Sequence, residues 1–593
     1  MFKNPIARAD KPSVKLAGTH DLGARSATTD QAHSDEAAPI PSDPRGPDSQ
    51  RPRPSDGFGS RPIARLVPQS GVQFIDLNLL GDQLAQTQRS FAEHRFPSAG
   101  GFRTVLLPLD RAGSGDVVWH PVTHRALAPD EIMSVSGRAA LDAFAGRWVP
   151  LPYLRFLGRD DAGQPSFDSG PENWARVFIG PRPDPDTVSS RGEVQPVRLV
   201  LAFDTRLEAG DRSGDRRYLA PNTDDAALGA SFRFADGAAD VAHFASRPWV
   251  DGWLRQVIDG QRLRVSGAMP PTRFELEHIA RFLVLADLLG QSLAMPEIRF
   301  LDTLSRRWPV AVTGVDLVLD ITATDTAAVL IERDAAGNAP MVAAAPLTIR
   351  NLAHPVTQFS GPIPTQIEFA PPPYGDPGLS RRSGRQDAFL WPSLGRIGRE
   401  AVALARGAAA TVGVTGHDAL SDLLGETGAT DEIWRIGADV AGDAVGPVVS
   451  GALLAHVAED GSPLSAGGEA RPPAVRPRFA PSALMTFFMT ELLLHAMSAV
   501  NATVATSEAG RAAGARRLQR IVLTLPAGMS PDMRDAHAAH ATKAIDLVWR
   551  ALGWDGPRDN GAPNRPVVEI GAGTELAAQV FELRREIATR YGN

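Results

Sequence analysis

One acidic residue and three threonines form the group in this sequence with the clearest chemical potential. Asp320 lies near the end of an aliphatic run, Val315-Asp-Leu-Val-Leu-Asp-Ile321, and Thr322, Thr324 and Thr326 follow in a short polar turn. Hydroxyl and backbone N–H groups in such a turn can hold phosphate oxygens, and a carboxylate at the strand end can order the water shell of Mg²⁺. The spacing predicts a phosphate site with Asp320 as the metal-ordering group. An ordinary hairpin with a hydroxyl-rich turn is the alternative.

The elements around this turn form an α/β pattern. Residues 315–321 and 327–332 are expected as a hairpin, and Met341 to Asn351 as a third strand after the turn at 334–338. Further along, Arg520-Ile-Val-Leu-Thr-Leu-Pro526 has the composition of a buried strand. The order after it predicts a βαβ unit beside the meander: a helix from Pro531 to Leu552 capped by Ser530, a strand at 566–570, and a final helix from Thr574 to Arg590.

The remainder of the chain divides by composition. Residues 1–62 are rich in Pro, Ser, Asp and Arg and are expected to be a disordered tail. Residues 63–305 mix strand patterns, at 72–79, 104–109 and 197–203, with a helix at 273–289 that Gly290 ends, which predicts a mixed α+β domain. Residues 315–593 form the α/β part. It contains a Pro-, Gly- and Arg-rich insertion at 353–393, expected to be a solvated loop, with anion binding by its arginines as the alternative.

Composition limits the function classes. The net charge of −7 and the scattered basic residues do not favour a nucleic-acid partner, and the absence of Cys excludes thiolate metal sites and cysteine nucleophiles. The first residues lack the apolar run of a secretory signal, so a cytoplasmic location is expected. The apolar stretch at 482–500 carries Glu491 and His495 on one helical face, which favours a buried core helix over a transmembrane segment.

Two other groups have a possible chemical role. His537 and His540 have a spacing that can bind a metal together with a carboxylate such as Asp535, but a solvated or capping role is expected. Phe244, Trp249 and Trp253 are expected to anchor a core, with a protein-binding patch as the alternative.

Several of these segments, in their order along the chain, resemble the virulence factor SrfB family. The likeness covers roughly residues 63 to 590 and is carried by five stretches: 66–76; 315–320 with 329–332; 387–394 with 396–401; 482–488; and 520–526 with 547–554. The resemblance implies the first lobe of an actin-like, or heat-shock-chaperone-like, ATPase fold of the ribonuclease H-like type. It also implies a site for ATP and Mg²⁺, with Asp320 as the catalytic and metal-binding residue and Thr322, Thr324 and Thr326 at the phosphates.

The sequence departs from that family pattern at functional positions. Thr322 occupies a position where actin-like ATPases generally have Gly, because a Cβ there crowds the phosphate. Apart from Lys543, the only lysines are Lys3, Lys11 and Lys15 in the expected tail. No second Gly-rich phosphate loop is found before Asn593.

These departures favour an interaction or scaffold component with a degenerate nucleotide site and a protein partner. Two alternatives stay open: an ATPase completed by a second lobe from a partner or a missing C-terminal half, and a truncated, non-functional copy of a longer family member.

Overall fold

The architecture is taken from a computed structural model of the chain. All described residues belong to one unit of contacts, Gly59–Asn593. The structure describes residues 62–80, 87–98, 101–109, 117–181, 196–209, 217–267, 273–300, 313–333, 343–370, 374–408, 416–417, 420–431, 433–436, 448–464, 473–500, 504–505, 516–525, 528–554 and 565–571. The expected tail up to residue 61, the turn at 334–338 and the expected helix at 574–590 lie outside these residues.

A mixed sheet organises the C-terminal half, in the order β15-β14-β13-β25-β26 with β18 also paired to β14. β13 and β14 form an antiparallel hairpin, β15 extends it, and β25 and β26 run parallel to β13 on its other side. The strands are β13 (Thr313–Ile321), β14 (Asp325–Glu332), β15 (Ala343–Pro346), β18 (Ile363–Pro364), β25 (Arg516–Thr524) and β26 (Val567–Ile570). The strands expected near 315, 327, 520 and 566 are therefore present. The expected third strand is split, because β16 (Thr348–Arg350) leaves the sheet to pair with β17 (Gln358–Ser360).

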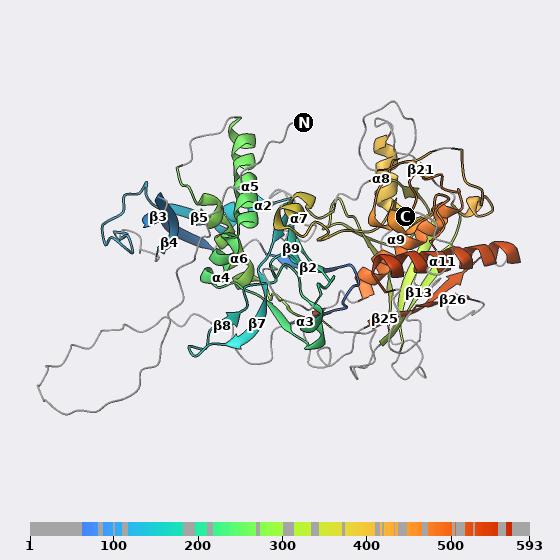
Figure 1. Ribbon diagram of the computed structural model, residues 1–593, viewed down its shortest axis with the longest axis horizontal. Coiled ribbons are helices and arrows are strands. Elements are labelled where there is room, and N and C mark those ends of the chain that lie inside the picture. The colour runs from blue at the N-terminus through green and yellow to red at the C-terminus, as the bar shows by residue number, and fades with distance from the viewer. Residues whose placement is uncertain are drawn as a thin grey trace, which may run out of the picture. The chain divides into compact units, whose positions relative to one another are not determined.

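Two long helices, α9 (Ala483–Val500) and α11 (Pro531–Ala551), cover one face of this sheet (Figure 1). Alternate strand residues such as Leu317, Leu319 and Leu523 share a hydrophobic cluster with both helices. Ser530 caps α11 by accepting a hydrogen bond from the Met533 N–H, as expected. Of the described helices, only α9 is long and apolar enough to span a membrane, and 89% of that stretch is buried. The expectation of a buried core helix is confirmed.

Three sheets build the N-terminal half. The largest has the order β24-β1-β12-β11-β7-β8, the second β2-β10-β9-β6, and the third β4-β3-β5. Their strands are β1 (Ile63–Leu66), β2 (Val72–Leu79), β3 (Gln88–Ser98), β4 (Gly101–Leu109), β5 (Met133–Ser136), β6 (Trp148–Pro150), β7 (Tyr153–Arg159), β8 (Pro165–Phe167), β9 (Ala175–Ile179), β10 (Val197–Asp204), β11 (Ser231–Phe234), β12 (Glu297–Phe300) and β24 (Val504–Ala505).

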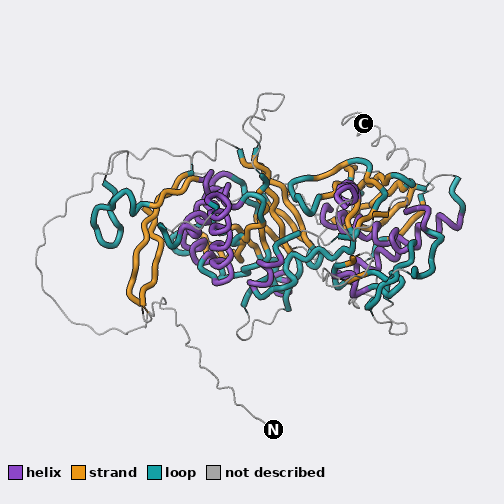
Figure 2. Tube along the Cα trace, turned by 90° about the horizontal axis from the view of Figure 1, so that it is seen from above, coloured by secondary structure: helices purple, strands orange, loops and turns teal. Residues whose placement is uncertain are grey.

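Helices of this half pack beside its strands, as the purple and orange segments of Figure 2 show. They are α2 (Gly137–Phe144), α3 (Thr223–Ala227), α4 (Ala238–Ala245), α5 (Pro248–Ser266) and α6 (Glu277–Ser292). The helix expected at 273–289 is present as α6, but it begins at Glu277 and continues through Gly290 to Ser292, so the expectation that Gly290 ends it is wrong. Phe244, Trp249 and Trp253 are buried in the core, so their anchoring role is confirmed.

The second sheet, β2-β10-β9-β6, contributes to both large hydrophobic clusters. Ile75, Val177 and Leu201 belong to the N-terminal cluster, while Phe74, Phe178 and Val200 belong to the cluster around α9. Since side chains alternate between the faces of a strand, both faces of this sheet contribute to a hydrophobic core. The remaining described elements are β19 (Ile367–Glu368), α7 (Pro377–Ser383), β20 (Arg396–Ile397), α8 (Gly398–Ala408), β21 (Gly416–His417), η1 (Leu420–Leu423), β22 (Arg435–Ile436), β23 (Val448–Val449) and η2 (Ala452–His456).

Candidate functional site

Asp320 lies at the carboxyl ends of the parallel strands. In the register of the sheet it stands beside Thr524 of β25 and Ala327 of β14. Asp320 is half-buried, and the Thr524 hydroxyl donates a hydrogen bond to the Leu319 carbonyl at 3.2 Å. Ligands of open α/β sheets bind outside the carboxyl ends of the strands, so this edge is the place to look for a site.

The turn after β13 is closed by its own polar groups. The Thr322 N–H donates to the Asp325 carbonyl at 2.9 Å, and the Thr322 hydroxyl donates to the same oxygen at 2.7 Å. The Asp325 N–H donates back to the Thr322 hydroxyl at 3.1 Å, and the exposed Thr324 hydroxyl donates to the Asp325 carboxylate at 2.9 Å. The side chain of Thr322 therefore stabilises the turn by bonding to both backbone groups of Asp325.

Thr326 lies on the buried side of the turn. Its hydroxyl and that of Thr365 are 2.9 Å apart, and both side chains are buried. The Thr365 N–H also donates to the Thr324 carbonyl at 3.0 Å, which ties the segment after β18 to the turn. The structure therefore brings Asp320, Thr322 and Thr324 to one edge but directs Thr326 into the interior.

These bonds limit what the turn can bind. A phosphate cradle needs backbone N–H and hydroxyl donors that are directed outward and unoccupied. The Thr322 N–H and the hydroxyls of Thr322, Thr324 and Thr326 all have protein partners. In this conformation these four donors are engaged within the chain.

A row of charged side chains crosses the same sheet at Asp316, four residues before Asp320 in β13. Arg520 of β25 binds buried Asp316 of β13 through two bonds, at 3.0 and 2.6 Å, and reaches Glu569 of β26 at 3.0 Å. Arg333, just after β14, also pairs with Asp316. This two-pronged arginine–carboxylate geometry is typical of strong pairing. Sequence reasoning missed this row, although the acid at 316 interrupts an otherwise aliphatic strand and was a visible signal.

A buried charge network lies beneath α9. Arg396 contacts Glu491 at 2.9 Å, and the Trp391 Nε1–H donates to both Glu491 oxygens at 3.1 Å. His495 Nε2 is 3.5 Å from the same carboxylate. Burial raises the pKa of Glu491, but Arg396 and the hydrogen bonds to the carboxylate outweigh it and the net pKa is lowered. Burial raises the pKa of nearby Glu400.

A second network joins the Arg-rich segment to the N-terminal sheet. Arg385 is buried and lies 3.3 Å from Asp204 of β10, which Arg206 also binds at 2.8 Å. Burial raises the pKa of Asp204, but the two arginines and the Phe389 N–H outweigh it and the net pKa falls well below its usual range. The expectation of a solvated loop is therefore wrong at Arg385. The anion it meets is a carboxylate of this chain.

The two histidines of α11 are also placed differently from the expectation. His537 is 0% exposed and His540 is 4% exposed, so a solvated or capping role is wrong. His540 Nδ1 lies 2.7 Å from the Thr486 hydroxyl of α9, while neither ring nitrogen of His537 has a hydrogen-bond partner among the residues that the structure describes. Burial lowers the pKa of each to about 4. Within the described residues, no group of three His, Cys, Asp or Glu residues is arranged to hold a metal ion.

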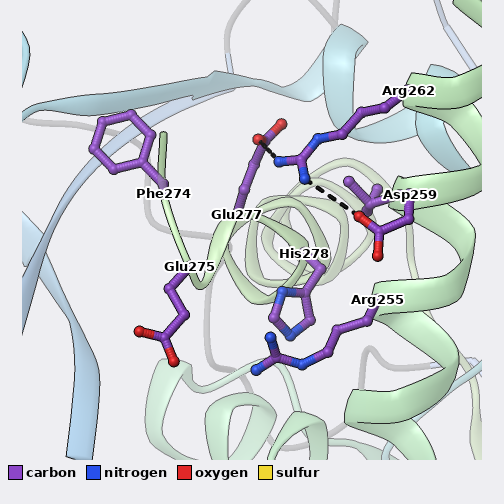
Figure 3. A pocket seen from close by; sticks show the side chains of 8 residues that line it. Arg255, Asp259, Arg262, Phe274, Glu275, Glu277 and His278 are labelled. Carbon is purple, nitrogen blue, oxygen red and sulfur yellow. Dashed lines mark hydrogen bonds and ion pairs between the residues drawn. The ribbon is translucent and has the colours of Figure 1, made fainter. Parts of the chain in front are cut away.

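A cavity of about 130 Å³ opens between α5 and the start of α6 (Figure 3). Its charges are largely paired: Arg262 binds Glu277 and lies 3.3 Å from Asp259, while Arg255 binds Asp251 at 2.9 Å. Burial lowers the pKa of His278, whose Nε2 is 2.7 Å from Asp251. Both arginines of this cavity are therefore engaged by carboxylates of the chain itself.

Comparison with known proteins gives a family but no close relative. The family model of virulence factor SrfB matches residues 60–569. No curated protein and no solved structure matched the chain. Since the match covers most of the sequence, the chain belongs to the virulence factor SrfB family.

Proposed function

We propose that residues 313–571 keep the architecture of the first lobe of an actin-like ATPase fold, and that the chain is a cytoplasmic interaction component of a virulence-associated assembly. The sheet order supports this. A three-stranded meander, β13-β14-β15, is joined on the β13 side by the parallel strands β25 and β26, with α11 between them. This is the meander with an adjacent βαβ unit that the order of strands and helices in the sequence predicts.

The observation that carries the functional proposal is the internal closure of the turn after β13. Where a phosphate would need outward donors, Thr322 donates both its N–H and its hydroxyl to the Asp325 carbonyl. The nucleotide site is degenerate, and the lobe serves as a scaffold for contacts with other proteins.

Calorimetry with Mg·ATP tests the proposal. The full chain is expected to give no binding heat up to about millimolar ATP, because the donors that would hold the phosphates already bond within the turn. Asp320→Ala is expected to behave identically. Asp130→Ala changes an exposed aspartate in a turn that precedes β5 of the N-terminal half and is the control. Low-micromolar binding that is lost in Asp320→Ala but kept in Asp130→Ala would overturn the scaffold proposal.

One observation favours a second candidate, an ATPase completed by a second lobe from another polypeptide. Asp320 remains half-buried at the carboxyl edge of parallel strands, beside Thr524, where a carboxylate can order Mg²⁺ and water. A related hypothesis is a truncated copy whose docking face is left open, since Val567 and Ile570 of the short strand β26 are 59% and 38% exposed. A monodisperse monomer in light scattering would argue against the truncated copy.

A further inference from the structure

The β3–β4 hairpin and the loop beside it expose large apolar side chains. Phe102 is 73% exposed, Trp119 is 60% exposed and Phe96 is 38% exposed, and Val117 and Val122 are also exposed. The base of the hairpin is anchored, because Ala92 and Leu109 form a small core with Leu127. Groups of exposed apolar residues often mark interaction sites on protein surfaces, and Trp, Phe and Arg are enriched at such sites relative to the rest of the surface.

β4 is the edge strand of its sheet, whose order is β4-β3-β5 (Figure 1). Nine residue pairs join β3 and β4, from Ser90–Leu109 to Ser98–Gly101, so the hairpin is regular. Within the part of the chain that the structure describes, β4 pairs with β3 alone. Its other side therefore presents backbone N–H and C=O groups that an incoming strand can use.

One face of the hairpin combines a cation with apolar side chains. Arg103, Val105 and Leu107 alternate along β4 and share a face with their cross-strand partners Phe96, His94 and Ala92. The His94 ring lies 4.4 Å from that of Phe96 and 4.8 Å from that of His120, centroid to centroid. The loop that carries Trp119 thus borders this same face.

The charge of this surface is positive at its tip. Arg103 is exposed and has no carboxylate partner among the described residues. Arg95, whose cross-strand partner is Thr104, lies on the opposite face of the hairpin and forms a weak surface pair with Glu275 at 3.8 Å, so it adds no charge to this face. A complementary partner must therefore supply a negative group near Arg103 and apolar groups further along the strand.

We propose that β4 binds an extended, acidic segment of a partner protein by strand addition. This rests on the proposed role as an interaction component and names its surface and the class of its partner. Side chains two residues apart on the added strand would lie beside Arg103, Val105 and Leu107. The segment should therefore carry an acidic residue with apolar residues two and four positions away, in either chain direction.

A phage-displayed library of random 12-residue peptides, panned against the full chain, tests this. The enriched peptides are expected to share that acidic and apolar spacing. A fluorescently labelled enriched peptide should lose at least about fivefold in affinity on Arg103→Glu, because opposed charges become like charges. Its analogue with alternate N-methylated amides should not bind, because strand addition needs those donors.

Arg198→Glu is the matched control, since Arg198 is an exposed arginine on the interior strand β10. It should leave peptide affinity unchanged. No enrichment, enrichment without the spacing, or equal affinity for Arg103→Glu would overturn the proposal. Co-sedimentation with phosphatidylserine vesicles that Arg103→Glu abolishes, without peptide binding, would assign the surface to membranes instead. None of these outcomes alters the Mg·ATP result, so a failure here is distinguishable from a failure of the degenerate-site proposal.

Discussion

Lowering the pH from 7.5 to 5 should destabilise this protein through His537 and His540 of α11. Both are buried, and desolvation lowers the pKa of each from 6.5 to about 4. Between these two values the unfolded chain binds protons that the folded chain excludes. The stability present above pH 6.5 is therefore lost progressively as the pH falls, and the loss is complete below about pH 4.

The magnitude follows from the two pKa values. At pH 5 a histidine with a pKa of 6.5 is almost fully protonated and one with a pKa of about 4 is almost fully neutral. This difference in protonation between the unfolded and folded chains lowers the free energy of unfolding by about 2 kcal/mol for each residue. For two histidines that titrate independently the loss is about 4 kcal/mol. Other groups add to the total, because burial also lowers the pKa of His278. The histidines of α11 must therefore be isolated by comparing variants.

Urea unfolding followed by tryptophan fluorescence measures the effect, since Trp549 of α11 is itself buried. His537→Leu removes one titrating ring and should reduce the pH-dependent loss by about 2 kcal/mol. His243→Gln is the control, because His243 lies in the last turn of α4 and is exposed. Equal pH dependence in the parent, His537→Leu and His243→Gln proteins would refute the assignment of this effect to the buried face of α11.

Three further changes have definite expected outcomes in the same unfolding assay. Glu491→Gln should lower the free energy of unfolding by about 3–5 kcal/mol, because it leaves Arg396 buried without its counter-charge. The double variant Arg396→Met, Glu491→Leu should lower it by less than the single change. A larger loss in the double variant would contradict the role of the ion pair. Ser530→Ala should cost about 1 kcal/mol through loss of the α11 cap, and no change would mean that the cap is dispensable. Gly451→Ala should cost at least about 2 kcal/mol, since Gly451 has φ +143° and a Cβ there would meet the Ser393 carbonyl; an unchanged midpoint would refute that packing.

The strands around Asp320 were predictable because their signals are local. Largely aliphatic runs predict β13 and β25, and Ser530 with Pro531 predicts the start of α11. The burial of α9 was also predictable, because Glu491 and His495 make a lipid-facing helix costly. The SrfB family was visible in the order of weak motifs, none of which was decisive alone.

The state of the candidate site was not predictable in the same way. Thr322, Thr324 and Thr326 look alike in sequence, but one locks the turn, one is exposed and one is buried against Thr365. Thr365 is distant in sequence, so no local pattern identifies it as the partner of Thr326. The same is true of Arg385, whose burial depends on Asp204.

The sequence by itself determined which segments become strands and helices, since hydrophobic period and capping act over a few neighbouring residues. Only the tertiary structure decided which polar groups are free to bind a ligand. A hydroxyl, an arginine or a histidine can be solvated, paired or buried, and its partner is usually far along the chain. In this protein the Thr322 hydroxyl of the predicted phosphate turn bonds to the Asp325 carbonyl, and two histidines expected at the surface lie in the core.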